Sequence, residues 1–151
     1  MKRHLNICIK IEETVGKIYR QLAKSPLVSA EVGRTLNEMA DDEDDHASQL
    51  RFALRFPDDS VVSSAREMLQ KAQELLIQAE HILKQASKME MTDQQAIEIG
   101  VKLEQNFCQA HIGNSFDFKD AQHRAMFAAM ALADEEHCKR LLTLQKRLAN
   151  R

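Results

Sequence analysis

Four segments of this sequence carry an acidic residue in the middle of an apolar stripe with helical spacing. Residues three and four positions apart lie on one face of an α-helix, and a face that packs against a core is normally apolar. Burying an unpaired carboxylate is costly, and several carboxylates on facing helices also repel one another. The pattern therefore predicts a helical bundle whose centre holds positive charge. The interrupting residues are Glu12, Glu43, Glu104 and Asp134.

The composition favours an all-α fold. The 151 residues include only four Gly, two Pro and no Trp, and 29% of them are charged. The β-branched and aromatic residues that favour strands are scarce beside abundant Ala, Leu, Gln, Glu and Lys. A chain of this length can bury a substantial core as one unit. We therefore expect a single all-helical domain over residues 1–151.

Helix-breaking and helix-capping residues divide the chain into five predicted helices. Pro26 and Pro57 mark the ends of the first two, because the residue before a proline is disfavoured in the α region. Thr92 and Gln95 have the spacing of a capping box at the start of the fourth. The predicted helices span about residues 5–24, 29–56, 60–87, 92–112 and 120–148.

The third predicted helix differs from the others because its apolar stripe is not interrupted. Alternating steps of three and four residues indicate a packing seam rather than a site. At 1.5 Å per residue this helix would span roughly 39 Å, enough to return the chain to the other end of a bundle. PDDS at 57–60 is the predicted linker before it, and GNSFDF at 113–118 is the predicted loop between the last two helices. The seam residues are Val62, Ala65, Leu69, Ala72, Leu76, Ala79, Leu83 and Ala86.

A histidine follows two of the acidic interruptions after one helical turn. Glu43 precedes His46, and Asp134 precedes His137, so each pair shares a helix face. The other aspartates of the acidic run around Glu43 are expected to face solvent, apart from Asp42, which flanks the stripe. The run is therefore predicted to combine a solvated face with one inward pair of metal ligands.

The two halves of the sequence resemble each other. IKIEE at 9–13 reappears as VKLEQ at 101–105, and MADDEDDHASQL reappears as ALADEEHCKRL. A duplicated hairpin folded about a pseudo-twofold axis would gather the carboxylates and two imidazoles around one point. This set can bind two metal ions, and its oxygen and imidazole donors suit iron or manganese better than zinc. The predicted metal ligands are Glu12, Glu43, His46, Glu104, Asp134 and His137.

Tyr19 and His111 occupy the same position in the repeat, seven residues after Glu12 and Glu104. Either can donate a hydrogen bond to a metal ligand or relay a proton or an electron, so both are candidate catalytic residues. The alternative interpretation is a buried polar side chain that a neighbour satisfies.

Other features of the sequence exclude several classes of function. A net charge of −2 and the absence of a basic run argue against binding to nucleic acid. No apolar run is long enough to span a membrane, so we expect a cytoplasmic protein without a membrane partner. Cys8, Cys108 and Cys138 lack Cys-x-x-Cys spacing, which excludes a rubredoxin-type iron site within this sequence and predicts reduced thiols.

These residues resemble the pattern of the ferritin-like superfamily and, within it, the rubrerythrin group. That pattern places Glu on the first helix, Glu-x-x-His on the second, Glu on the next and Glu-x-x-His on the last. IEETVGKIYRQLA and MADDEDDHASQL are similar to it, and the match covers both predicted hairpins, about 5–56 and 92–148. The resemblance implies a ferritin-like four-helix bundle, with the helix at about 60–87 as an additional crossover.

The resemblance also implies a di-iron oxidoreductase. Two iron ions would cycle between Fe2+ and Fe3+ and react with hydrogen peroxide or dioxygen, with manganese or zinc as alternative metals. A separate electron-donor protein is expected, because no rubredoxin domain is present, and a homodimer is expected from the family. Two residues depart from the pattern: Asp134 is one methylene shorter than glutamate, and Phe107 stands where rubrerythrins carry an additional carboxylate.

Two other functions fit the same residues. The centre could oxidise ferrous iron for iron handling or storage without turning over a reductant. It could also bind metal only to stabilise a structural or regulatory helical bundle. The sequence leaves both alternatives open.

Overall fold

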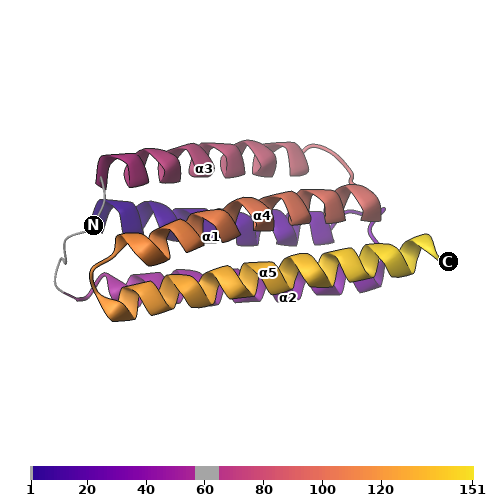
Figure 1. Cartoon of the computed structure of the whole chain (residues 1–151). Helices are drawn as coiled ribbons and strands as arrows, with labels where there is room; N and C mark the ends of the chain where they lie inside the picture. The colour runs from indigo at the N-terminus through magenta and orange to yellow at the C-terminus, as the bar shows by residue number, and fades with distance from the viewer. Residues whose placement is uncertain (1, 57–64) are drawn as a thin grey trace.

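Helices make up nearly all of the described chain. The computed structural model describes residues 2–56 and 65–151, and these residues form five helices and no β-strand (Figure 1). The all-α prediction is therefore confirmed. The predicted linker at 57–60 and the predicted start of the third helix at 60–64 lie outside the described residues. The helices are α1 (Lys2–Ala23), α2 (Ala30–Ala53), α3 (Ala65–Ala86), α4 (Asp93–Asp117) and α5 (Ala121–Ala149).

Side-chain caps determine where three of the helices begin. Ser29 before α2 and Asp120 before α5 each accept a hydrogen bond from the backbone amide three residues later. Thr92 and Gln95 form the reciprocal capping box that the sequence predicted for α4. These bonds satisfy amides that the first turn of a helix leaves without partners.

The predicted loop at 113–118 is wrong over most of its length, because α4 continues through it. Gly113 and Asn114 suggested a loop since both are weak helix formers. Asn114 is nevertheless buried, and Phe118, just past the helix, stacks on Phe127 with the ring centroids 5.2 Å apart. Burial of Asn114 and the packing of Phe118 just past the helix outweigh the weak local preference of the segment for helix.

Two helical hairpins form a bundle. α1 packs along α2, and α4 packs along α5, and these two pairs make the most extensive contacts between helices. Smaller contacts of α2 with α5 and of α1 with α4 join the hairpins. Figure 1 shows the α4–α5 pair in front of the α1–α2 pair, with the two chain termini at opposite ends of the molecule.

α3 lies outside this four-helix arrangement and packs mainly on α1 (Figure 1). Ala72, Ala79 and Ala86 of the predicted seam are buried in the core, while Leu76 and Leu83 are partly buried against it. Small alanine side chains allow a close approach between helices. The seam therefore packs on the bundle of its own chain.

Hydrogen bonds join the turn after α1 to the turn before α4. The Ser25 hydroxyl donates to the Met91 carbonyl at 2.7 Å and accepts from the Met91 amide at 3.0 Å. The Ser29 amide donates to the Asp93 carboxylate at 2.7 Å. These bonds fix the two hairpins relative to each other along the bundle axis. That alignment determines which side chains meet in the interior.

Two apolar clusters fill the bundle at different heights. One includes Val15 and Leu36, and the other includes Leu50 and Phe127. Glu12, Glu43 and Asp134 lie between these clusters along their helices, and Glu104 lies among residues of the first cluster, between Leu103 and Phe107. These four acidic residues therefore form a polar layer that is covered by apolar side chains above and below.

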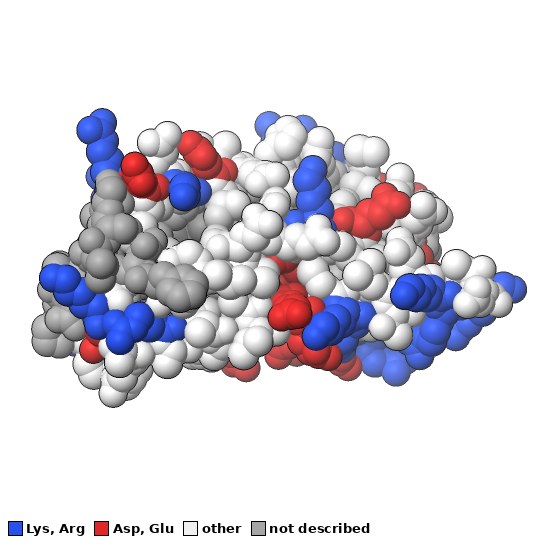
Figure 2. Space-filling model, in the orientation of Figure 1, with Lys and Arg blue, Asp and Glu red and all other residues white. Residues whose placement is uncertain are grey.

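The outer faces of the helices carry charges of both signs. Figure 2 shows Lys and Arg gathered toward the C-terminal end of α5, and Asp and Glu nearer the middle of the same view. Among the described residues, no helix combines the length and the apolar character that crossing a membrane requires.

We predict that Gly113→Ala stabilises the protein by roughly 0.5–1 kcal/mol, because alanine is the better helix former. Gly113 lies within α4 without a positive φ, and a Cβ at this position would meet nothing within 4 Å. Urea unfolding measures the change. Gly100→Ala in the same helix is the control, because its Cβ would lie 2.7 Å from a methyl carbon of Leu141 and the contact offsets the gain. A loss of stability in Gly113→Ala would contradict helix at this position.

Candidate metal centre

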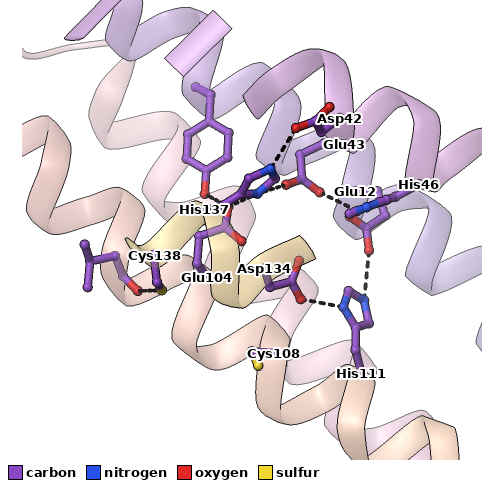
Figure 3. Close-up of polar contacts among 12 residues, drawn as sticks. Glu12, Asp42, Glu43, His46, Glu104, Cys108, His111, Asp134, His137 and Cys138 are labelled. Carbon is purple, nitrogen blue, oxygen red and sulfur yellow. Dashed lines mark hydrogen bonds and ion pairs between the residues drawn. The ribbon is translucent and has the colours of Figure 1, made fainter. Parts of the chain in front are cut away.

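All six predicted metal ligands lie together in the polar layer. Each is at most 6% exposed, and together they come from four different helices. Figure 3 shows their carboxylate and imidazole groups turned toward one another in the interior of the bundle. The layer holds Glu12 from α1, Glu43 and His46 from α2, Glu104 from α4, and Asp134 and His137 from α5.

The ligand atoms form two overlapping groups, and each group could hold a metal ion. Within a group, the atoms that the residues offer all lie within 4.8 Å of one another. Glu43 belongs to both groups, so its two oxygens can serve both positions. One group consists of Glu43, Glu104, Asp134 and His137, and the other consists of Glu12, Glu43 and His46.

Three buried atoms of the layer support this assignment. Glu43 Oε1, Glu104 Oε2 and His137 Nδ1 have no hydrogen-bond partner among the described residues. His137 Nδ1 lies 3.5 Å from Glu43 Oε1 and 3.3 Å from Glu104 Oε1. A buried polar atom without a partner is costly, and a cation among these side chains would bind all three atoms. The residues present therefore fit a bound metal ion.

Basic side chains do not neutralise the layer. No lysine or arginine in the described part of the chain forms an ion pair with the six residues. Arg20 instead lies 2.6 Å from Asp44 and 3.1 Å from Asp41 on the outer face of α2, and Arg51 pairs with Glu13. The negative charge of the interior is therefore left to histidines or to a metal ion.

Three buried histidines supply positive charge when no metal is bound. Burial disfavours a charged imidazole, but hydrogen bonds to the neighbouring carboxylates outweigh it. They raise the pKa of His46 and of His137 to about 11, and the pKa of His111 to about 10. At neutral pH all three rings are therefore protonated in the metal-free protein.

The positive charge of the histidines does not stabilise all four carboxylates equally. Burial opposes ionisation of Glu12, but hydrogen bonds from His111 and His46 lower its pKa to about 2. Burial and the charge of Glu43 raise the pKa of Glu104 to about 8. Burial and the charge of Glu12 also raise the pKa of Glu43. Positive charge is therefore scarcest at Glu43 and Glu104, which also carry oxygens without hydrogen-bond partners.

Tyr19 and His111 each contact the glutamate of the opposite hairpin. The Tyr19 hydroxyl donates to Glu104, while His111 lies 3.0 Å from Glu12 through Nε2 and 2.6 Å from Asp134 through Nδ1. Burial and the adjacent carboxylates raise the pKa of Tyr19 well above its ordinary value, so its hydroxyl keeps its proton. Both candidate catalytic residues therefore touch predicted ligands, from matching positions of the sequence repeat.

Asp134 faces the centre despite its shorter side chain. It is 1% exposed, and one of its oxygens accepts the hydrogen bond from His111. It also offers an oxygen to the four-residue ligand group. Replacing glutamate by aspartate in the last motif therefore leaves a carboxylate in the layer.

The sequence analysis missed the contact that Asp42 makes. Its carboxylate lies 2.9 Å from His137 Nε2, and its side chain is 49% exposed (Figure 3). A hydrogen bond at Nε2 leaves Nδ1 as the nitrogen that faces Glu43 and Glu104. The repeat gave no signal for this contact, because the position that matches Asp42 in the second half is Ala133.

The three cysteines are free thiols, and none of them belongs to either ligand group. Burial and the charge of Glu12 raise the pKa of Cys8 well above its ordinary value, so this thiol stays protonated. A protonated thiol is a poor metal ligand, since the thiolate is the form that binds. The described centre is therefore built from oxygen and nitrogen donors.

Comparison with known proteins does not extend this assignment. No family model, curated protein sequence or solved structure matches the chain. The geometry of the polar layer is therefore the feature of this chain that bears on its function.

We predict that the metal-free protein loses stability as the pH rises from about 7 to about 9. The three histidines have folded pKa values of about 10 to 11 against an ordinary 6.5, so they stabilise the fold fully below 6.5 and lose this effect as the pH approaches their folded values. The raised pKa of Glu104 acts in the same direction. Each proton that only the folded state retains contributes a slope of roughly 1.4 kcal/mol per pH unit.

Urea unfolding at a series of pH values in the presence of a chelator measures this slope. His111→Gln is expected to reduce it, because one retained proton is lost. His81→Gln is the control, since His81 is exposed on α3. A wild-type stability that does not change over this range would show that the rings are not held protonated.

Proposed function

We propose that the chain is a ferritin-like di-iron oxidoreductase of the rubrerythrin type, which reduces hydrogen peroxide or dioxygen with electrons from a separate donor protein. The observation that supports it most directly is the pair of buried ligand groups that share Glu43. Each group also includes one histidine, His46 or His137. Carboxylate oxygens combined with imidazole are a donor set that suits iron.

A ferritin-like arrangement also accounts for the path of the chain. In this proposal α1–α2 and α4–α5 are the duplicated hairpins, and α3 is the crossover between them. The repeated sequence around Glu12 and Glu104 supports it. So do the reciprocal contacts of Tyr19 and His111 with the glutamate of the opposite hairpin.

Two bound iron ions would supply one electron each as they change from ferrous to ferric. Reduction of hydrogen peroxide to two waters consumes two electrons and two protons, and the donor protein would restore the electrons. Within the protein, Glu43 serves both metal positions, and Asp42 orients His137 through its ring nitrogen. Tyr19 orients Glu104, and it is the only tyrosine of the sequence that could relay a proton or an electron.

Oxidation of ferrous iron for iron handling is the second candidate, and the position of Asp42 favours it. This half-exposed carboxylate contacts the buried His137, so it connects the outer face of α2 with the ligand layer. Asp41 and Asp44 lie beside it and share a single cation, Arg20, so a net negative charge remains on this face. Such a surface attracts cations. In this alternative the centre oxidises ferrous ions and releases them without turning over a reductant.

We predict that the anaerobic protein binds two ferrous ions per chain. Glu12→Ala is expected to weaken one position by removing a ligand, whereas Glu43→Ala is expected to weaken both because this residue is shared. Calorimetric titration and metal analysis measure the affinity and the number of ions. Glu13→Ala is the matched control, because Glu13 is the adjacent acid but pairs with Arg51 on the surface.

Retention of both ions by Glu43→Ala would contradict the assignment. Their loss in Glu13→Ala as well would show that the effect does not come from the layer. His137→Ala tests the four-residue group separately, since His46 belongs only to the other group.

We predict that the iron-loaded protein consumes hydrogen peroxide repeatedly when an external reductant is present. Tyr19→Phe should lower the rate by roughly 10²–10⁴-fold, the range for loss of one positioned proton donor, while two ions remain bound. Stopped-flow spectroscopy of iron oxidation and a peroxide assay measure the two steps. A single stoichiometric oxidation would favour iron handling instead, and tight binding without oxidation would favour a purely structural role for the metal.

A further inference from the structure

A cavity of about 300 Å³ lies between α1, α3 and α4, beside the polar layer. Its lining includes Glu12 and His111, so it reaches the ligand group at the α1 side. The cavity is not needed to hold a metal ion, because the ligands already lie within coordinating distance of one another. Its volume falls at the lower end of the range for small-molecule sites, roughly 300–1,000 Å³.

Small residues on three helices create this space. Cys8 of α1, Ala72 of α3, and Ala110 and Gly113 of α4 all line it. Protein interiors are normally close-packed, and an unfilled space costs stability in proportion to its volume. Larger apolar side chains at these positions would fill the cavity. The space therefore has the character of a site that is kept open for a ligand.

The cavity has an exposed mouth and a buried floor. Lys71 of α3 and Gln109 of α4 are exposed lining residues, which places the opening between these two helices. Glu12, Phe107 and His111 are buried lining residues, which places the floor against α1 and the polar layer. A molecule from solvent can therefore reach the side of the metal centre without a rearrangement of the helices.

The residues that line the cavity indicate which chemical groups a ligand would carry. Phe107 offers an aromatic ring, and Met68 offers a thioether. Aromatic rings pack favourably on both groups. Asn114 and Glu12 add a buried amide and a carboxylate. The amide can donate or accept a hydrogen bond and the ionised carboxylate only accepts, which matches a single hydroxyl group.

The charges around the cavity favour a neutral occupant. At the mouth, Glu67 and Lys71 of α3 carry opposite charges that sum to zero. At the floor, an anion would meet the carboxylate of Glu12, and a cation would lose its hydration against apolar lining residues such as Phe107 and Met68. We propose that this cavity is a binding site for a small neutral aromatic molecule with one hydroxyl group, a phenol, whose hydroxyl points toward Glu12 beside the metal centre.

Titration of phenol into the protein tests the proposal. The metal-free protein is used first, so that the result does not depend on the proposed di-iron function, and calorimetry gives the affinity. NMR shift changes of the protein amides give the location. Saturable binding is expected, with shifts concentrated among the lining residues of α1, α3 and α4. Benzoate, which has the same ring and a negative charge, is expected to bind more weakly.

Two variants reduce the space from neighbouring positions of α4. Ala110→Leu fills the cavity, and Gly113→Leu narrows it from a position where a Cβ would meet nothing within 4 Å. Each should weaken phenol binding by roughly tenfold or more, the effect of misplaced methylenes in an apolar pocket. Ala128→Leu, at an exposed position on α5 outside the cavity, is the matched control. Circular dichroism verifies that each variant is folded.

The outcomes separate this proposal from the proposed function. Iron binding without saturable phenol binding, or equal phenol affinity in all four proteins, would overturn the phenol site and leave the metal centre standing. Phenol binding to the cavity by a protein that binds no iron would support the site and reject the di-iron function. Benzoate binding as tightly as phenol would overturn the assignment of a neutral ligand.

Discussion

Four helices bury negative charge in one layer of the bundle. The structure depends on how this charge is compensated. Glu12, Glu43, Glu104 and Asp134 are at most 2% exposed, so each must be neutralised within the protein. No arginine or lysine of the described residues reaches them. The histidines of the same layer take this role, and the apolar clusters above and below keep solvent away. The aligned hairpins, the buried histidines and the unpartnered atoms are all consequences of this one requirement.

Protons and metal ions compete for the same positions in this layer. A proton on His137 Nδ1 occupies the nitrogen that faces Glu43 and Glu104, and a metal ion would replace it. Protons on the histidines leave several buried atoms of the layer without hydrogen-bond partners. Divalent cations carry more charge into the same volume. The layer could therefore hold a metal ion in place of these protons.

Much of the fold and the centre followed from spacing alone, because helical periodicity reports which side chains face inward. The stripes identified Glu12 and Glu43 as buried before any contact was known, and the capping residues placed the start of α4. Contacts between helices were harder to predict from the sequence. The hydrogen bond of Asp42 to His137 depends on the alignment of α2 with α5, and the helix over 113–117 depends on burial of Asn114. Neither is a local property of the sequence.

The reciprocal contacts of Tyr19 and His111 also bear on how the molecule folds. Each hairpin supplies a hydrogen-bond donor to a buried glutamate of the other, in addition to the contacts of His46 with Glu43 and of His137 with Glu104 within a hairpin. A single collapsed hairpin would lack these donors, so the negative charge on its apolar face would be only partly compensated. Docking of the halves and charge neutralisation should therefore occur as one cooperative event. The polar layer would thus act as a checkpoint for assembly of the two hairpins.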